Sequence, residues 1–202
     1  MKLYYSPGAC SLAPHIVANE AGISLALEKV DTGKHMTAGG VDYYTINPKG
    51  QVPFLQLDDG STLSEGPIIA QYLADQAQAR RLMPESGTGA RYRVMEWQNF
   101  ITSELHKGFS PLFSPRFDAA AKAAHAATLR QRYEWIDKQL AGKDYLTGSE
   151  FTAADAYLFT VTSWAKYVKL DLSDLKNLQA YLARVASRPA VAKTLKEEGL
   201  AA

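Results

Sequence analysis

Along the first eighty residues, hydrophobic and polar positions switch repeatedly between the spacing of a strand and the spacing of a helix. Short apolar runs bounded by turn residues indicate strands, and apolar residues three and four apart indicate amphipathic helices. The predicted elements are strands at 2–5, 24–30, 52–57 and 61–63, and helices at 11–20 and 66–76. Residues 31–50 are polar, contain glycine and carry only a weak helix signal. The order β-α-β-(α)-β-β-α predicts an α/β unit.

The pattern changes after residue 76. Residues 77–89 lose periodicity and gain Pro and Gly, which is typical of a linker between domains. Beyond the linker the pattern is helical, and Thr152 with Asp155 forms a capping-box pair that opens one helix. The predicted helices cover about 90–107, 118–141, 153–169 and 173–187, with a short helix from Pro189. We therefore expect an α/β domain at 1–78 and an all-helical domain at 89–202.

Composition and charge narrow the classes of function. Of the 202 residues, 47% are hydrophobic and 21% are charged, and the net charge is +1. This balance suits a globular protein and offers no basic surface for nucleic acid or an anionic membrane. No apolar stretch reaches about 18 residues, and the N-terminus lacks the apolar run of a signal peptide. A single cysteine cannot form an intrachain disulfide and fits a reducing compartment, so we expect a cytoplasmic protein.

The single cysteine, Cys10, lies between the turn Pro7-Gly8-Ala9 and the predicted start of a helix. A sulfur at that point faces unpaired backbone amides and the positive end of the helix dipole, and both lower the pKa of a thiol. Because Ala13 is not a cysteine, Cys10 can form a mixed disulfide but cannot resolve it internally. A buried, unreactive cysteine is the alternative. Tyr5 and Ser11 are rival hydroxyl donors to an anionic sulfur, and His15 is expected to be structural.

Two further motifs surround the predicted hairpin. Pro53 follows Val52 at the start of a strand, so it marks a strand start, a strand edge or a cis peptide bond, with an ordinary trans proline as the alternative. Glu65 and Gly66 precede a predicted helix, where free amides suit a carboxylate and the Glu65 side chain suits an ammonium group. Together they fit the zwitterionic end of an amino acid. The alternative is simple N-capping by Ser64.

The first predicted helix of the second domain has two distinct faces. Its apolar face carries Val94, Trp97, Ile101 and Leu105. The opposite face carries Asn99, Ser103 and His106 at i, i+4 and i+7, flanked by Glu104 and Lys107. A solvated face usually consists of Glu, Lys and Arg, whereas these shorter side chains make directional hydrogen bonds. The pattern favours the wall of a binding site over an ordinary solvated face.

These motifs together resemble the bacterial beta-class glutathione transferases. The longest matches are Asn-Pro-Lys-Gly-Gln-Val-Pro at 47–53, Ser-Glu-Leu-His-Lys-Gly-Phe at 103–109 and Ala-Asp-Ala-Tyr-Leu-Phe at 154–159. The resemblance covers essentially the whole chain. It implies the glutathione transferase fold, an α/β thioredoxin-like N-terminal domain followed by an all-α C-terminal domain, assembled as a homodimer.

The resemblance also implies roles for individual residues. Cys10 would lie beside the glutathione sulfur, and Val52 would pair with the cysteinyl backbone, with Pro53 cis. Glu65 and Gly66 would hold the γ-glutamyl end. The residues implied to line the site from the helical domain, some of them across the subunit interface, are Asn99, Ser103, Glu104, His106 and Lys107, with Trp164 bordering the pocket for the electrophile.

The sequence departs from the family at one position. Where the family usually has a lysine for the glycyl carboxylate, this chain has His35, with Lys34 beside it. A neutral imidazole binds a carboxylate less firmly than an ammonium group does at neutral pH. We keep His35 as the candidate and Lys34 as its substitute.

The expected function comes from the resemblance. It is conjugation of the glutathione thiol to small, hydrophobic electrophiles in detoxification, with glutathione as a cosubstrate, no permanently bound cofactor and no metal. Nucleic acid and membrane are not expected partners. One alternative is a glutathione-dependent thiol–disulfide oxidoreductase or peroxidase that uses Cys10. The other is a non-catalytic binding module on the same fold, since fold does not dictate function.

Overall fold

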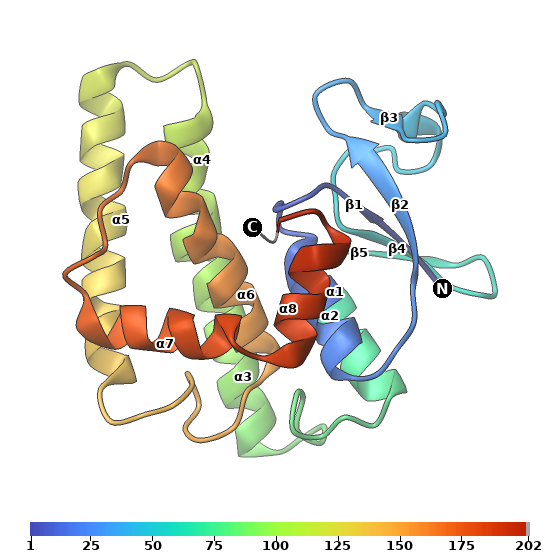
Figure 1. The fold of residues 1–202 in the computed structure, drawn as a ribbon. Coiled ribbons are helices and arrows are strands. Elements are labelled where there is room, and N and C mark those ends of the chain that lie inside the picture. Colours follow the sequence, from blue (N-terminus) through green and yellow to red (C-terminus); the bar gives the residue numbers. More distant parts are fainter. Residues whose placement is uncertain (201–202) are drawn as a thin grey trace. The chain divides into compact units, whose positions relative to one another are not determined.

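The computed structural model describes residues 1–200, and the chain divides into two compact units (Figure 1). The first unit comprises Met1–Pro84 together with the C-terminal stretch from Arg188, and the second comprises Glu85–Ser187. The sequence instead placed the stretch after Arg188 in a helical domain at 89–202. No helix among residues 1–200 has the length and apolar character needed to cross a membrane.

The first unit contains a five-stranded sheet in the order β3-β2-β1-β4-β5. Its strands are β1 (Lys2–Tyr5), β2 (Ala26–Asp31), β3 (Met36–Thr37), β4 (Phe54–Gln56) and β5 (Thr62–Ser64). Strand β1 pairs in parallel with β2 and antiparallel with β4. The parallel pair is joined by helix α1 (Leu12–Glu20), as a parallel crossover requires. The other helices of this unit are α2 (Gly66–Gln76) and α8 (Pro189–Glu197).

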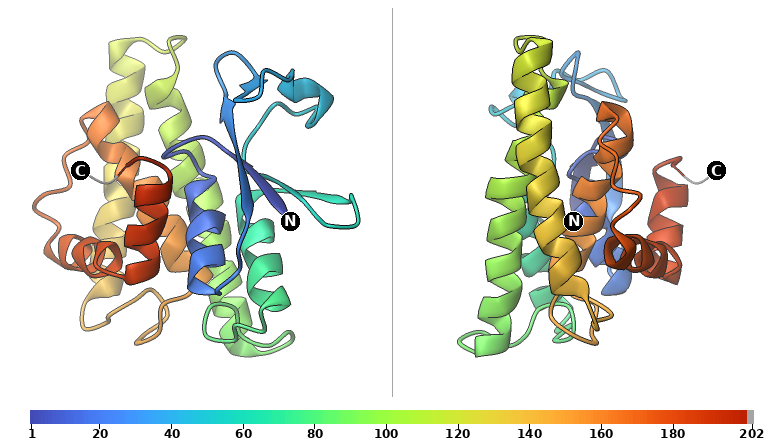
Figure 2. Two further views of the ribbon diagram at one scale, coloured as in Figure 1. Left: turned by 45° about the vertical axis from the view of Figure 1, so that its right-hand side comes forward. Right: turned by 90° about the vertical axis from the view of Figure 1, so that its left-hand side faces the viewer.

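Helix α1 is buried over seven consecutive residues, from Leu12 to Ala18. It packs against both α2 and α8, and the views in Figure 2 show α1 and α2 side by side. Because helices pack against it on more than one side, even the polar residue His15 of α1 is buried. On β1, Leu3 and Tyr5 share one face, and Tyr5 contacts the ring of His15 on α1.

The opposite face of the sheet is covered by the segment after β2. Tyr4 of β1 packs there with Val30, Tyr43 and Phe54. The weak helix expected in 31–50 is reduced to the short strand β3 and one 3-10 turn, η1 (Tyr43–Thr45). The reason is that Tyr43 is the only buried residue of η1, so a longer helix would have no apolar face to bury.

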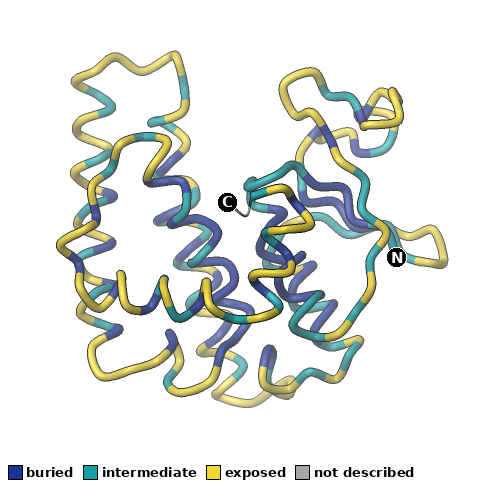
Figure 3. Tube along the Cα trace, viewed as in Figure 1, coloured by how far each residue is buried: buried dark blue, intermediate teal, exposed yellow. Residues whose placement is uncertain are grey.

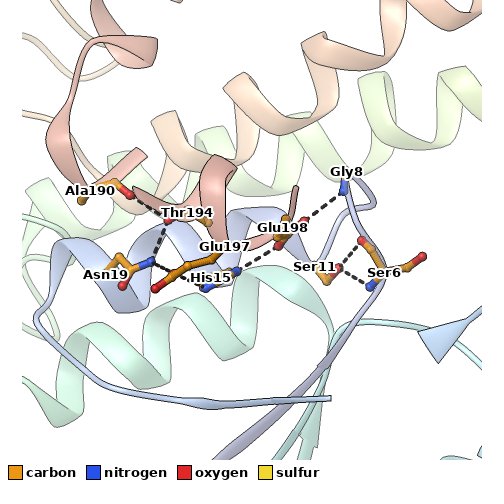
Figure 4. Close-up of polar contacts among 9 residues, drawn as sticks. All are labelled: Ser6, Gly8, Ser11, His15, Asn19, Ala190, Thr194, Glu197 and Glu198. Atoms are coloured by element: carbon orange, nitrogen blue, oxygen red, sulfur yellow. Dashed lines mark hydrogen bonds and ion pairs between the residues drawn. The ribbon is translucent and has the colours of Figure 1, made fainter. Parts of the chain in front are cut away.

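A polar network joins α1 to α8 within the first unit (Figure 4). The Glu198 carboxylate lies 2.9 Å from His15 Nδ1 and accepts a 2.9 Å hydrogen bond from the Gly8 amide. His15 Nε2 lies 3.0 Å from Glu197, and the amide of Asn19 donates to Glu197 and to the Thr194 hydroxyl. His15 is therefore structural, as the sequence predicts, and it ties the C-terminal helix to the turn before Cys10.

Replacement of Glu198 by alanine is expected to lower the free energy of unfolding by about 2–3 kcal/mol. The Gly8 amide and His15 Nδ1 would both lose this buried acceptor, since Glu198 is only 5% exposed. Urea unfolding measures the change. Glu198→Gln is the matched control, because it keeps an acceptor oxygen and should cost less. Equal losses in the two variants would contradict this expectation and show that a neutral acceptor oxygen of the same shape cannot replace the carboxylate.

The second unit is helical, as predicted. Its elements are α3 (Gly89–Phe100), a π-helical turn η2 (Ile101–His106), α4 (Lys107–Phe113), α5 (Ala119–Leu140), α6 (Ala153–Thr162), a 3-10 segment η3 (Ser163–Val168) and α7 (Lys176–Ala186). Helices α3 and α4 form one continuous run through the π turn, so the helix expected at 90–107 extends to Phe113. Helix α6 is buried along almost its whole length and lies at the centre of this unit's core (Figure 3).

Candidate active site

Cys10 lies in the turn that leads from β1 into α1. The Ala9 amide donates to the Ser6 carbonyl, and the Leu12 and Ala13 amides donate to the carbonyls of Ala9 and Cys10. The expectation that the sulfur faces unpaired amides is therefore wrong for Leu12 and Ala13. The thiol instead donates to the carbonyl oxygen of Val52, at 3.2 Å.

Ser11 does not compete with Cys10 as a hydroxyl donor. Its side chain is fully buried and its hydroxyl donates to the Ser6 carbonyl while accepting a bond from the Ser6 amide. A hydroxyl has one proton to donate, so this pairing leaves none for the sulfur. Ser11 instead closes the turn that holds Cys10.

The Val52-Pro53 peptide bond is cis, one of the alternatives that the sequence left open. Because the Val52 carbonyl accepts from Cys10, the sulfur and this peptide unit are adjacent. Gly66 lies close to both Cys10 and Pro53, since a Cβ there would lie 3.7 Å from the Pro53 ring and 3.9 Å from the Cys10 carbonyl. Three of the predicted site elements thus meet in the first unit.

Glu65 occupies the N-cap position of α2 with a φ of 70°, and its own side chain makes no capping bond. Lys49 Nζ lies 3.1 Å from both the Glu65 carboxylate and the Ser64 hydroxyl. Ser64 therefore does not cap α2, and that alternative is wrong. Lys49 is a charged neighbour that the motif analysis did not single out, although it lies inside the 47–53 match.

His35 has a φ of 54°, and its ring stacks on Tyr44 at a centroid distance of 4.4 Å. Within residues 1–200 its Nδ1 is buried without a hydrogen-bond partner. Gly50 allows this packing, because a Cβ there would lie 2.6 Å from the Tyr44 ring and 2.9 Å from Nδ1. The Lys34 side chain is 81% exposed and lies 4.0 Å from Asp31.

The polar residues of the helical unit do not form one continuous face. Asn99 and Ser103 are exposed, and Glu104 pairs with Arg132 at 2.9 Å. Lys107 is also exposed. The π turn changes the register, because its i to i+5 hydrogen bonds add a residue to the turn and rotate the next part of the helix. The stripe is therefore broken at His106.

His106 points into an aromatic cluster. Its Nδ1 lies 2.7 Å from the Tyr157 hydroxyl, and its ring meets Trp164 edge-on at 4.9 Å. Trp164 is 8% exposed and also contacts the rings of Phe109 and Phe113. Sequence reasoning did not single out Phe109, Phe113 and Tyr157 as neighbours of His106 and Trp164, although two of these three lie in the 103–109 and 154–159 motifs. In residues 1–200 no group of three or more His, Cys, Asp or Glu side chains could hold a metal ion.

Comparison with known proteins decides the family. The N-terminal domain of glutathione S-transferases matches residues 8–76, and their C-terminal domain matches residues 100–189. The chain belongs to the glutathione S-transferase family. Glutathione S-transferase GstA of Escherichia coli O157:H7 is 46% identical over 200 residues, covering 99% of this chain and 100% of the relative.

Solved structures of glutathione S-transferases agree with this assignment. A sphingomonad glutathione S-transferase complexed with glutathione is 46% identical, with a TM-score of 0.94 and full coverage of both chains. A bacterial beta-class enzyme from Sphingomonas chungbukensis is also 46% identical, with a TM-score of 0.94 over 99% of this chain and 100% of that one. The predictions of a beta-class glutathione transferase, of its two-part fold and of an enzyme are confirmed.

Proposed function

We propose that this glutathione transferase conjugates the glutathione thiol to small hydrophobic electrophiles, with Cys10 beside the attacking sulfur. The observation that carries the proposal is the 3.2 Å contact between Cys10 Sγ and the Val52 carbonyl at a cis proline. If the cysteinyl backbone of glutathione pairs with Val52 in an extended conformation, its thiol comes to lie next to Cys10.

The ends of glutathione would be held by charge complementarity. The Glu65 carboxylate would bind the γ-glutamyl ammonium group, and the first amides of α2, from Gly66, would bind the adjacent carboxylate. Lys49 pairs with Glu65, so its ammonium group would also lie near the γ-glutamyl carboxylate that the α2 amides bind. His35 would bind the glycyl carboxylate, with Lys34 as its substitute.

The chemistry would begin with ionisation of the glutathione thiol, whose proton passes to water. The start of α1 favours an anion. Once the cysteinyl amide of glutathione donates to the Val52 carbonyl, Cys10 would turn its S–H from that carbonyl to the neighbouring thiolate. A thiol pKa lowered by two units corresponds to about 3 kcal/mol in favour of ionisation. The thiolate then attacks the electrophilic carbon, a carbon–sulfur bond forms, and the leaving group departs with the electron pair of its bond.

The helical unit would supply the remainder of the site. We assign Asn99, Ser103, Glu104, His106 and Lys107 to contacts with glutathione, some of them in a homodimer across the subunit interface. Trp164 and its aromatic neighbours would border the electrophile pocket. The sole cysteine, which forms no intrachain disulfide, supports a cytoplasmic location. Glutathione acts as a cosubstrate, with no permanently bound cofactor.

Thiol–disulfide exchange is a second candidate activity. The half-buried Cys10 supports it, because a cysteine beside the glutathione sulfur can form a mixed disulfide. Turnover of a halogenated aromatic and turnover of a glutathionylated disulfide separate the two activities.

Replacement of Glu65 by glutamine tests the glutathione site. We expect the dissociation constant for glutathione, measured by calorimetry, to rise at least about tenfold, since a hydrogen bond to a charged group contributes about 1.5–3 kcal/mol. Glu150→Gln removes an exposed carboxylate from elsewhere in the chain and controls for net charge. Unchanged affinity in Glu65→Gln would remove Glu65 from the site, and no glutathione binding by the unaltered protein would reject the proposed function.

A further inference from the structure

The backbone carbonyl of Gln51 accepts hydrogen bonds from two buried side chains in the loop that leads to the cis proline. The Tyr43 hydroxyl donates to it at 2.9 Å, and the side-chain amide of Asn47 donates at 2.7 Å. Tyr43 is fully buried and Asn47 is 3% exposed, so both donors come from the interior. A carbonyl oxygen has two lone pairs, and these two bonds occupy both. The direction of the Gln51 carbonyl is therefore fixed from inside the first unit.

The two donors are themselves held in place. The Tyr43 ring packs against Tyr4 in the core cluster, at a centroid distance of 5.7 Å. Burial raises the pKa of the Tyr43 phenol to about 12, so the hydroxyl keeps the proton that it donates at neutral pH. The Asn47 side-chain oxygen accepts from the Lys49 amide at 3.2 Å, and its backbone carbonyl accepts from the Gly50 amide at 2.8 Å. Neither donor can turn away without breaking other contacts of this loop.

The fixed carbonyl determines where the next amide points. The Gln51–Val52 peptide bond is trans, and in a planar trans peptide the C=O and the N–H point in opposite directions. The Val52 N–H therefore points away from the two buried donors. Among residues 1–200 this amide has no hydrogen-bond partner. The carbonyl of Val52 accepts from the Cys10 thiol, so an open backbone donor lies next to the acceptor that faces the sulfur.

We propose that Tyr43 and Asn47 are positioning residues, whose bonds to the Gln51 carbonyl aim the Val52 N–H at the cysteinyl carbonyl of bound glutathione. This inference rests on the proposed function, in which the cysteinyl backbone pairs with Val52. An extended peptide that pairs with a single residue in this way uses both the N–H and the C=O of that residue. Fixing the N–H raises affinity, because a group that points correctly only part of the time binds in proportion to that fraction.

Hydrogen exchange of the Val52 amide, followed by NMR, tests the direction of the N–H without any substitution. We expect fast exchange in the free protein, because the N–H has no internal partner, and exchange at least about tenfold slower with saturating glutathione. Slow exchange in the free protein would overturn the proposal, and so would an equal rate with and without glutathione. A folding defect cannot obscure this result, since the unaltered protein is measured.

Tyr43→Phe removes one of the two donors and keeps the buried ring. We expect the dissociation constant for glutathione, measured by calorimetry, to rise about three- to tenfold, as for loss of one neutral hydrogen bond, and kcat to change less than about twofold. Tyr4→Phe is the matched control, because its hydroxyl belongs to the same cluster but bonds to Gln56. It should leave the affinity unchanged. An unchanged affinity in Tyr43→Phe, or an equal rise in both variants, would overturn the proposal.

A glutathione analogue separates aiming of the Val52 N–H from a general change in the loop. An E-alkene in place of the cysteinyl-glycine peptide bond removes the carbonyl oxygen that the N–H would bind and keeps the charges of the tripeptide. Tyr43→Phe should therefore weaken the binding of glutathione but not the binding of the analogue. An equal loss of affinity for both ligands would mean that Tyr43 acts on the site as a whole, and would overturn the proposal.

The same measurements distinguish failure of this inference from failure of the proposed function. If the unaltered protein binds glutathione while exchange of the Val52 amide stays the same, the inference fails and the glutathione site stands. If calorimetry detects no glutathione binding by the unaltered protein, the proposed function itself fails.

Discussion

Asp155→Ala is expected to lower the free energy of unfolding by about 3–5 kcal/mol. The Asp155 carboxylate is completely buried in the capping box of α6. It accepts hydrogen bonds from the Leu146 amide at 2.9 Å, the Thr152 amide at 2.8 Å and hydroxyl at 2.9 Å, and the Tyr181 hydroxyl at 3.2 Å. Alanine would leave these donors without their acceptor in a dry core. Chemical unfolding at pH 7 measures the loss.

Asp118→Ala is the matched control for this prediction. Asp118 caps helix α5 with one exposed hydrogen bond, to the Ala121 amide at 2.8 Å. The same substitution there should cost only about 1 kcal/mol, because water can replace an exposed cap. If the two variants lose equal stability, burial of Asp155 contributes nothing beyond ordinary capping.

The same carboxylate should make stability depend on pH. Burial raises the pKa of Asp155 to about 6, against the lowering effect of its hydrogen bonds. In the unfolded chain an aspartate titrates near pH 4, so between about pH 4 and pH 6 the folded protein binds more protons than the unfolded one. This contribution to stability is present below pH 4 and is lost as the pH rises through 6. The difference between the unaltered protein and Asp155→Ala should therefore be larger at pH 5 than at pH 7.

Cys10→Ala is expected to abolish mixed-disulfide formation while reducing conjugation by about tenfold or less. In the exchange step the Cys10 thiolate attacks one sulfur of glutathione disulfide, a Cys10–glutathione bond forms and glutathione thiolate leaves. Alanine cannot take part. Conjugation loses only the S–H donor beside the glutathione thiolate, and one pKa unit corresponds to about 1.4 kcal/mol. Mass spectrometry detects the adduct, and turnover of a halogenated aromatic measures conjugation.

Cys10→Ser separates hydrogen-bond donation from thiol chemistry. A hydroxyl can still donate to a thiolate but cannot form a disulfide, so conjugation should stay near that of the unaltered protein while the adduct is lost. If conjugation by Cys10→Ala stays at the level of the unaltered protein, and the unaltered protein forms no adduct with glutathione disulfide, Cys10 is not the working residue.

Strong local patterns predicted their elements well. Strand β1 at 2–5 and helix α2 at 66–76 match the prediction residue by residue. Turn residues follow β1, Gly66 and Pro67 begin α2, and the apolar residues between these boundaries have a clear period. The capping box at Thr152 and Asp155 is also present as predicted. Such signals depend on neighbours within a few residues, so the sequence alone reveals them.

Local patterns failed where packing decides the conformation. Segment 31–50 has no clear period, and burial of Tyr43 against Tyr4 and Phe54 shapes it. The π turn in 101–106 has no sequence signal of its own, because its residues suit an α-helix equally well. Helix α8 was predicted, but its attachment to α1 depends on His15 and Glu198, which are 183 residues apart in the chain.

By itself, the sequence determined the α/β-then-helical order, the family and the position of Cys10 ahead of a helix. Only the tertiary structure decided which distant groups the Cys10 thiol, the His106 imidazole and the Gly8 amide contact. Cys10 meets a carbonyl 42 residues away, His106 meets a hydroxyl 51 residues away, and Gly8 meets a carboxylate 190 residues away. The physical reason is that periodicity and capping arise from local geometry, whereas these contacts exist only once distant segments pack together.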